Sequence, residues 1–312
     1  MSNELYSEEK FIFMTLDPIH IGTGGTNLGI VDNTIIREAG SNIPIIPGTS
    51  LSGAAKMYAA MLMGDLDAAG SKKPKSTENP VSYTFGYING SGSKQTSKAG
   101  VVSFSDARIV LFPVCSSEGT IWVTTRAMLN EIGFDMKDLG PDEEKAYHLG
   151  GTDENSKIKI GWLFIDVENI TIEKPKLGGL AEKDEWKVVE QKIYIVSDKL
   201  FTQIVNDNLE TRTSVAINPE TGAAEDQALF TYEAIPRATW LISTVIQDDY
   251  KIEGFSDSMK EDKYKENGKI NCWKSPMDVV RAGFKIIEFM GIGGMTTRGF
   301  GRMKIISGGD NQ

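Results

Sequence analysis

The stretch TTRGFGRMK, residues 296–304, contains the side chains best suited to holding a charged ligand. Glycine lets a backbone approach a ligand closely, because it has no Cβ. Arg298 and Arg302 carry guanidinium groups, which can bind phosphate oxygens. A tight turn with two solvated arginines explains the stretch equally well. These residues alone therefore indicate either a phosphate-binding loop or a surface turn.

A single carboxylate, Asp32, stands just before the alternating residues 34–37 in the stretch GIVDNTIIREAG. Two prolines follow, and the chain then enters a predicted helix. An aspartate before a strand is most often a turn residue, because its side chain bonds the nearby backbone. Taken by itself, the sequence around Asp32 favours a turn.

The sequence excludes several common kinds of site. Residues 22–29 lack the third glycine of the dinucleotide fingerprint, and a strand pattern follows them. Residues 291–301 lack the Gly-Lys-Ser/Thr of a P-loop. No Cys or His cluster has zinc spacing, and no Gly-x-Ser-x-Gly elbow occurs. The two histidines are His20 and His148, and His148 lies in an acidic segment, which disfavours a ribonuclease with paired imidazoles.

The composition is that of an ordinary globular protein. The 312 residues are 40% hydrophobic and 24% charged, and the net charge of −10 argues against a uniformly basic nucleic-acid binder. No apolar run reaches about 18 residues, and the polar, acidic N-terminus is unlike a signal peptide. We therefore expect no membrane partner. Two cysteines make no disulfide framework, which fits the cytoplasm.

The charge is unevenly distributed along the chain. Residues 72–98 hold five lysines and one glutamate, and residues 281–304 hold five bases and one acid, so each segment has a net charge of +4. Residues 131–157 hold eight acids and three bases, a net charge of −5, and are interpreted as an exposed acidic insertion. The two basic segments are compatible with a local basic surface on this acidic protein. Charge clusters of this kind are more commonly solvated loops.

The elements that would position these residues are mostly strands. A first strand, apolar on both faces, is predicted in residues 9–22. A helix follows, with Thr49 or Ser50 as its N-cap. Residues 75–100 are rich in Gly, Ser, Lys and Asn, which predicts a long mobile loop.

The second half of the chain has the clearest signals. Two strand-like arms flank a turn signal at residues 218–222, so a long hairpin is expected at about residues 205–240. A helix is predicted between a Ser275 cap and a stop at Gly291. Strands outnumber helices, which favours an α+β fold, and no clean boundary divides residues 1–312, so we expect one domain with insertions.

Six segments together resemble a known family. Four are similar to the RAMP (repeat-associated mysterious protein) superfamily of CRISPR effector subunits: PIHIGTGG (18–25), LGIVDNTIIRE (28–38), IPIIPGTSLSGAAK (43–56) and GGMTTRGFGRMK (293–304). Two more resemble the backbone subunit of the type III-B, Cmr-type complex: FSDARIVLFPVCSSEGTIWVTTRAML (104–129) and TSVAINPETGAAEDQALFTYEAIP (213–236). The resemblance covers most of the chain, and residues 132–200 contribute little to it.

The resemblance implies a ferredoxin-like, RRM-related core with insertions and a long β-hairpin thumb. It also implies the partners: guide crRNA, target RNA, further copies of the chain in a filament, and other subunits of the CRISPR effector complex. Each thumb would displace one base pair between guide and target. Each copy would then cleave target RNA beside that kink, acting as an endoribonuclease within the assembled complex.

The resemblance assigns the catalytic role to Asp32, which matches the aspartate of the family's Val-Asp loop. Its carboxylate would bind Mg²⁺ or another divalent cation, or position the attacking 2′-hydroxyl. His20 matches a family histidine that would contact guide phosphate or assist the cut, and Tyr232 and Glu233 match positions near the scissile site. A strand-end histidine and strand-surface residues are the alternatives for these three.

Contacts to guide RNA are implied for the residues Lys56, Arg298, Arg302, Ser50 and Gly299. Such contacts are to phosphate and sugar, so binding would not depend on sequence. Ala228, Leu229 and Phe230 would form the thumb wedge, with packing inside the hairpin as the alternative for the phenylalanine. Ser52 and Cys115 stand where the family often has a lysine and an arginine, which removes two positive charges from the predicted RNA surface.

Other functions stay open at this stage. The type III-A equivalent backbone subunit shares the first segments, the hairpin and the glycine-rich end. A non-catalytic guide-RNA-binding filament subunit would share the fold without the cut. A guide-processing endonuclease of the same superfamily would normally use a better-placed histidine. An α+β protein that binds a small ligand on its glycine-rich loop is compatible with the acidic composition.

Overall fold

The computed structural model has an α+β architecture, which confirms the predicted fold class. The residues that the structure describes are 5–24, 31–70, 79–89, 96–136, 145–150, 156–171, 173, 175–177, 179–248, 254–261, 263–266 and 269–308. No helix among these residues is long and apolar enough to cross a membrane.

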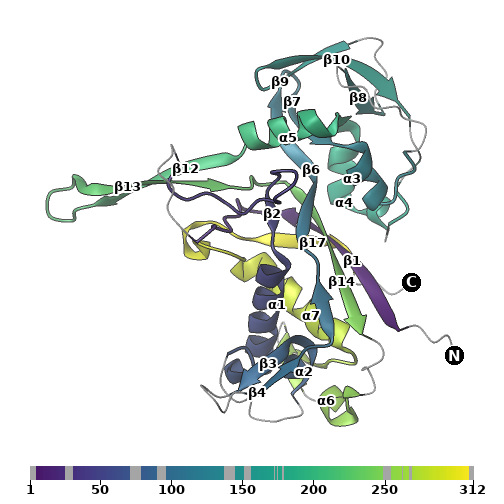
Figure 1. Cartoon of the computed structure of the whole chain (residues 1–312), viewed down its shortest axis with the longest axis vertical. Coiled ribbons are helices and arrows are strands. Elements are labelled where there is room, and N and C mark those ends of the chain that lie inside the picture. The colour runs from purple at the N-terminus through teal and green to yellow at the C-terminus, as the bar shows by residue number, and fades with distance from the viewer. Residues whose placement is uncertain are drawn as a thin grey trace.

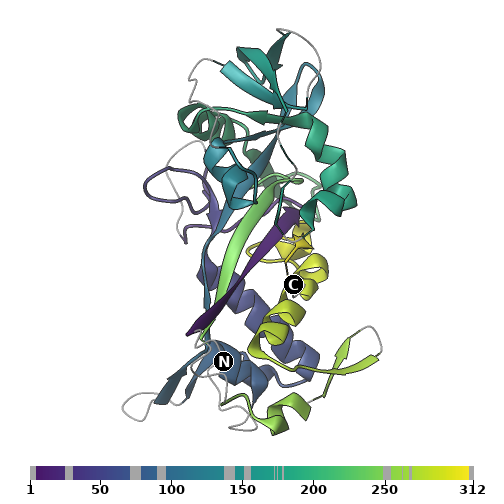
Figure 2. The ribbon, with the colours of Figure 1, turned by 90° about the vertical axis from the view of Figure 1, so that its right-hand side faces the viewer.

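A central antiparallel sheet runs through the middle of the molecule (Figure 1). Its strands lie in the order β17 (Met303–Ser307), β1 (Tyr6–Thr15), β14 (Trp240–Asp248) and β6 (Ala107–Ser116), and the short strands β2 (Ile45–Ile46) and β5 (Val102–Phe104) pair with β6 and β14. Phe11, Ile12 and Phe13 are fully buried, because β1 is apolar on both faces as predicted. Figure 2 shows β1 and β14 side by side.

Two long helices, α1 (Gly48–Met63) and α7 (Pro276–Met290), pack together against this sheet (Figure 2). Phe284 of α7 meets the rings of Phe11 and Phe13 edge-on, with centroids 5.1 Å apart in each pair. These contacts fix α7, and with it the glycine-rich chain that follows the helix.

The predicted N-terminal cap residue is confirmed for α7 and is wrong for α1. Ser275 caps α7 as expected. Thr49 and Ser50 do not cap α1, because both lie inside the helix, which begins at Gly48. The Gly48 N–H instead donates to the carboxylate of Asp106 at 2.8 Å, so a residue distant in sequence satisfies this helix end.

β6 continues upward into a second group of strands at the top of Figure 1. In order from β6, these are β7 (Gly119–Thr124), β11 (Ile193–Ile195), β8 (Lys145–Leu149), β10 (Leu163–Ile170) and β9 (Ser156–Ile160). The helices beside them are α3 (Arg126–Glu131), α4 (Asp184–Val189) and α5 (Asp198–Asp207), with 3-10 turns at Leu180–Glu182 and Glu190–Lys192. β9 also pairs with β6, so this group closes on itself.

The prediction that residues 131–157 form an exposed acidic insertion is wrong for part of the segment. Ile132 and Phe134 are buried in a hydrophobic cluster that also contains Trp186 of α4. β8 lies between β11 and β10, with Ala146 fully buried. These apolar runs are short and are flanked by acidic residues, so the charge of the whole segment conceals their burial in the sequence. The rest of the segment, residues 137–144 and 151–155, lies outside the described residues.

Residues 75–100 are not one mobile loop either. Their described part forms α2 (Pro80–Phe85) and a hairpin of β3 (Gly86–Asn89) and β4 (Thr96–Ala99); residues 75–78 and 90–95 lie outside it. Val81 and Tyr83 are buried in a cluster with Trp273, so a distant segment orders this stretch. The other elements at this end are α6 (Asp257–Glu261), β15 (Lys263–Glu266), β16 (Lys269–Cys272) and a 3-10 turn at Leu66–Ala68.

A long hairpin projects sideways from the body of the molecule (Figure 1). Its strands, β12 (Glu210–Ile217) and β13 (Ala224–Ala234), pair in a two-stranded sheet of their own. Asn218 holds the turn: its side chain accepts from the Glu220 N–H at 2.8 Å, and its carbonyl accepts from the Gly222 N–H at 2.9 Å. The two arms and the turn between them match the sequence signal.

Candidate functional site

Three loops meet the return strand of the hairpin where it leaves the body. The loops are residues 16–24 after β1, residues 31–44 before β2, and residues 291–302 between α7 and β17. The Asn33 N–H donates to Thr231 O and the Glu233 N–H donates to Asn33 O, each at 3.0 Å, so the second loop lies along β13. These bonds bring together three of the predicted site residues, Asp32, Tyr232 and Glu233.

One oxygen of the Asp32 carboxylate is hydrogen-bonded to the hairpin, and the other has no partner among the described residues. Its Oδ2 accepts from the Thr231 N–H of β13 at 2.7 Å. Its Oδ1 makes no hydrogen bond with any described residue, and the side chain is half-buried. A carboxylate held in this way can bind a cation or accept a proton while its position stays fixed.

His20 is only 8% exposed and is held in one orientation. Its Nδ1 lies 2.6 Å from the backbone carbonyl of Glu233. Since a carbonyl can only accept, Nδ1 donates this bond, and in a neutral imidazole Nε2 is then an acceptor. Nε2 is 3.0 Å from the place where a Cβ on residue 22 would stand, so Gly22 makes room for the ring.

Both carboxylate oxygens of Glu233 are bound to other groups in the chain. They accept from one terminal nitrogen of Arg37 at 2.9 and 3.0 Å. Oε2 also accepts from the Ile35 N–H at 3.3 Å. Arg37 in turn donates through Nε to Asn206 of α5 at 3.1 Å. Arg37 therefore ties the Asp32 loop to the hairpin and to α5, a role that the TIIRE pattern does not reveal.

Tyr232 packs between the hairpin and the glycine-rich loop. It is 5% exposed, and its hydroxyl lies 2.8 Å from Ser214 Oγ of the opposite strand. Its ring contacts Phe300 edge-on at 5.4 Å. Arg212 lies over the other ring, 4.8 Å from the Phe300 centroid. These contacts hold the base of the hairpin against the chain that follows α7.

The glycine-rich loop of residues 291–302 lays its backbone against the His20 segment. The Gly294 N–H donates to His20 O at 2.9 Å, and the Gly301 N–H donates to Pro18 O at 2.8 Å. Gly301 has a φ of +95°, and a Cβ there would stand 2.5 Å from Ile292 O. Only glycine permits this approach without strain.

Gly301→Ala is expected to lower stability more than Gly299→Ala, its matched control. Both glycines have left-handed φ values, +95° and +80°, so each alanine costs about 1 kcal/mol in the backbone. A Cβ at Gly299 meets nothing within 4 Å, so the collision at Gly301 should add about 2 kcal/mol. Urea unfolding measures both. Equal losses would contradict the close packing of this loop.

Arg298 and Gly299 stand at the exposed tip of this loop, after the 3-10 turn Thr296–Arg298. The Arg298 side chain makes no hydrogen bond or ion pair within the described part of the chain. Arg302 donates to the Asp17 carboxylate, and this hydrogen bond raises the pKa of Arg302. Arg298 is thus the freer of the two arginines to bind an anion.

Lys56 and Ser50 lie on α1, and no hydrogen bond joins either side chain to the described residues around Asp32. The Lys56 ammonium donates to the carbonyl of Gly86 at 2.8 Å. Burial lowers the pKa of Lys56. An ammonium has three N–H donors, so an RNA phosphate could accept from Lys56 while the bond to the Gly86 carbonyl is kept.

The predicted wedge residues lie on β13. Leu229 is 66% exposed and Phe230 is half-buried, with its ring centroid 6.0 Å from that of Tyr232. The side chain of Ala228 lies outside the described residues. Leu229 is therefore the better exposed of the two described side chains.

The described residues offer one carboxylate for a metal rather than a preformed cluster. No group of three or more His, Cys, Asp or Glu side chains able to hold a metal ion occurs among them. Mg²⁺ commonly keeps several waters and takes one or two carboxylates together with substrate phosphates. Asp32 Oδ1 fits that mode, in which RNA would supply further oxygens.

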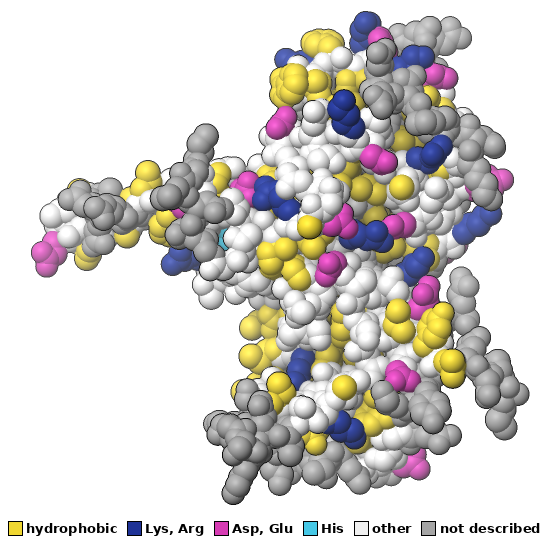
Figure 3. Space-filling model, in the orientation of Figure 1, with side chains coloured by type: hydrophobic (Ala, Val, Ile, Leu, Met, Phe, Trp, Pro, Cys, Tyr) yellow, Lys and Arg dark blue, Asp and Glu magenta, His cyan; other side chains and the backbone are white. Residues whose placement is uncertain are grey.

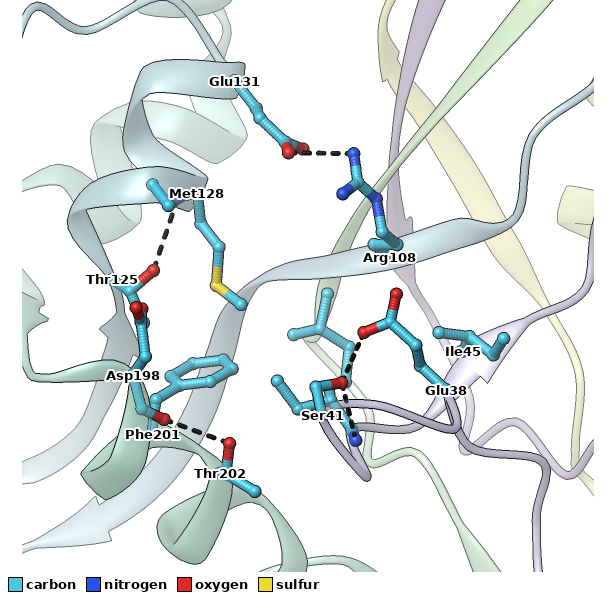
Figure 4. Close-up of a pocket in the computed structure, with 13 residues that line it drawn as sticks. Glu38, Ser41, Ile45, Arg108, Thr125, Met128, Glu131, Asp198, Phe201 and Thr202 are labelled. Carbon is cyan, nitrogen blue, oxygen red and sulfur yellow. Dashed lines mark hydrogen bonds and ion pairs between the residues drawn. The ribbon is translucent and has the colours of Figure 1, made fainter.

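A separate pocket of 310 Å³ lies between β6, α3, α5 and the loop before β2 (Figure 4). Apolar side chains such as Met128 and Phe201 line it together with the acidic Glu38. Figure 4 shows Arg108 reaching Glu131, an ion pair of 2.8 Å. None of the predicted site residues lines this pocket.

One family model and one curated relative match most of the chain. The model of the RAMP superfamily matches residues 12–304. The CRISPR system Cmr endoribonuclease Cmr4 of Pyrococcus furiosus is 29% identical over 275 residues, which are 82% of this chain and 86% of that protein.

Solved structures share the fold. A chain of the type III-B Cmr-beta complex bound to cognate target RNA has a TM-score of 0.62 at 14% identity, covering 97% of this chain and 99% of that chain. Oligomeric Cmr4 from Pyrococcus furiosus has a TM-score of 0.58 at 19% identity, covering 98% and 100%. Both likenesses extend over nearly the whole chain.

Proposed function

We propose, from the premise that the chain belongs to the RAMP superfamily, that it is a backbone subunit of a type III-B CRISPR effector complex. In this proposal copies of the chain bind guide crRNA as a filament and cleave complementary target RNA at regular intervals. Its similarity to a Cmr endoribonuclease over most of both chains supports the subtype. Neither Cys115 nor Cys272 forms a disulfide, which fits a cytoplasmic complex.

The observation that carries the proposal is the position of Asp32 at the root of the hairpin. Its Oδ2 accepts from the Thr231 N–H of β13, so Oδ1, which has no partner among the described residues, is held beside the element that would part the two RNA strands. A kinked target is needed there, because a regular A-form duplex does not hold its 2′-oxygen in line with the phosphorus. The hairpin and the carboxylate would thus act at one place.

In the proposed reaction the target 2′-oxygen attacks the neighbouring phosphorus, and the bond from phosphorus to the 5′-oxygen breaks. Asp32 Oδ1 takes the 2′-hydroxyl proton, or would hold a divalent cation if one binds, and water protonates the leaving 5′-oxygen. A bound Mg²⁺ would supply Lewis-acid stabilisation of phosphate charge. His20 Nε2 is a second acceptor for RNA hydroxyls, and Glu233 positions the Asp32 loop through Arg37.

Cleavage of end-labelled target RNA by the guide-loaded complex tests the proposal. Regularly spaced cuts in a complementary target, and none in a scrambled one, are the expected result. Target binding without cuts would contradict the catalytic part and favour the non-catalytic filament subunit. Assembly with type III-A rather than type III-B subunits would contradict the subtype.

Arg298→Ala is expected to weaken guide-RNA binding several-fold and to reduce the slope of log affinity against log salt by about 1. The reason is that the exposed Arg298 has no partner within the described part of the chain and would neutralise one phosphate. Lys187→Ala is the matched control, since this exposed lysine on α4 pairs with Asp184. Anisotropy titrations at several salt concentrations give both slopes. Equal slopes for the two variants would show that Arg298 does not contact an RNA phosphate.

A further inference from the structure

Two largely exposed aromatic side chains stand at the top of the molecule, where β9 turns into β10. Trp162 is 70% exposed and Phe164 is 72% exposed. Phe164 lies on the solvent face of β10, since the alternating Ile165 and Val167 are buried. Figure 3 shows hydrophobic and basic side chains together at this end of the molecule. Rings as exposed as these contribute little to the core.

A lysine faces Phe164 across the strand pair. Lys159 and Phe164 are partners in the antiparallel register of β9 and β10, so their side chains are neighbours on the solvent face. Lys159 is exposed and forms no ion pair with any described residue, whereas Lys157 pairs with Asp166 at 3.1 Å. Lys159, Trp162 and Phe164 are here called the platform. It combines two aromatic rings with one positive charge that has no ion-pair partner among the described residues.

The platform adjoins the hairpin through α5. The Trp162 indole N–H donates to the carboxylate of Asp207, the last residue of α5, at 3.3 Å. This bond fixes the edge of a ring that is otherwise largely exposed. The preceding residue, Asn206, accepts from Arg37 beside the Asp32 loop. The same helix end therefore carries contacts to the platform and to the candidate site.

We propose that the platform binds single-stranded RNA by stacking, with one base on Trp162, another on Phe164, and the Lys159 ammonium on a phosphate. The proposal rests on the RNA-binding function proposed above, and it extends the RNA path from the hairpin root along the end of α5. Every base has a π-face, so the platform would bind RNA without sequence preference.

A second copy of the chain is the other occupant that exposed rings could bind. Two aromatic side chains bury about 300–500 Å², which is less than the roughly 800 Å² per partner of a stable interface. The charges around them are already paired within the strand group, Lys157 with Asp166 and Lys145 with Glu168. The ammonium of Lys159, which has no ion-pair partner in the described part of the chain, instead favours a phosphate.

Trp162 can report its own occupancy, because the other four tryptophans are buried. Trp122, Trp186, Trp240 and Trp273 are at most 7% exposed. The full chain is titrated with a single-stranded RNA of about 12 nucleotides, while tryptophan emission and the anisotropy of a dye on the RNA are recorded. An abasic ribose-phosphate chain of equal length is the control ligand. We expect RNA to quench the exposed emission and the abasic chain to leave it unchanged.

Variants of the two aromatic residues test whether the change in tryptophan emission comes from Trp162 and whether both rings contribute to RNA affinity. Trp162→Ala and Phe164→Ala should each weaken RNA binding about 10-fold. Phe289→Ala is the matched control, because Phe289 is 69% exposed on α7, and it should bind RNA as the wild type does. Trp162→Phe keeps a ring and removes the fluorophore, so it should lose the quenching and keep most of the affinity.

The outcomes separate this proposal from the function on which it rests. RNA binding by anisotropy with unchanged Trp162 emission would overturn the platform and leave the RNA-binding function standing. No RNA binding at all would overturn both. If Phe164→Ala left RNA affinity unchanged but dissociated oligomers in light scattering, the rings would be a contact between copies and the platform would be wrong.

Discussion

Asp32→Asn is expected to slow target-RNA cleavage by the guide-loaded complex at least about 100-fold, with target affinity unchanged. Asparagine keeps the side-chain oxygen that accepts from the Thr231 N–H, so the loop should stay beside β13. It removes the negative charge and the basic oxygen that either role of Asp32 requires. Gel analysis of end-labelled target gives the rate, and filter binding gives the affinity.

Two further variants separate chemistry from structure. Asp32→Ala removes the anchor as well as the charge, so it should lose cleavage and also unfold at a lower temperature. Asp198→Asn changes an exposed carboxylate at the start of α5 and should cut as the wild type does. If Asp32→Asn kept the wild-type rate and Asp32→Ala lost it, Asp32 would be an anchor and its catalytic assignment would be wrong.

Arg37→Met is expected to lower the free energy of unfolding by about 2 kcal/mol. The guanidinium bonds both oxygens of Glu233 and donates to Asn206. The two charged side chains are 20% and 14% exposed, so methionine leaves the Glu233 carboxylate partly buried without its counter-charge. Urea unfolding measures the loss. The effect should include fraying of the hairpin base, which hydrogen exchange of the Glu233 amide detects.

Companion variants test whether Glu233 positions or catalyses. Glu233→Gln keeps an oxygen that accepts from Arg37, so cleavage should fall less than about 10-fold. Lys157→Met breaks the surface pair with Asp166, whose side chains are 68% and 59% exposed, and should change stability by less than about 0.5 kcal/mol. Cleavage as low in Glu233→Gln as in Asp32→Asn would show that Glu233 acts in the chemistry.

Features that depend on neighbouring residues could be predicted from the sequence. The turn at residues 218–222 and the Ser275 cap each need only a few adjacent side chains, and the structure has both. The burial of both faces of β1 follows equally from its unbroken apolar run. The α+β fold class follows from the number and type of such local signals.

Contacts between distant residues could not be predicted in this way. Asp32 lies 199 positions from Thr231, and Arg37 lies 196 positions from Glu233. Family resemblance marks Asp32 and Glu233 as site residues, but only the fold reveals that Arg37 holds one of them. The order of α2 has the same cause, because Trp273 packs against Val81 and Tyr83. The catalytic role of Asp32 stays a prediction.

The position of β1 has a consequence for how the protein is made. β1 leaves the ribosome long before its partners β14 and β17, where Leu241 faces Phe13 on one side and Ile305 on the other. Until β14 and β17 have been synthesised, the apolar strand β1 has no pairing partners. This slows folding and makes the nascent chain prone to aggregation. Thr231, which anchors Asp32, also comes late. A chain whose synthesis has not yet reached β13 therefore lacks the anchor of Asp32 and cannot assemble the proposed cutting site.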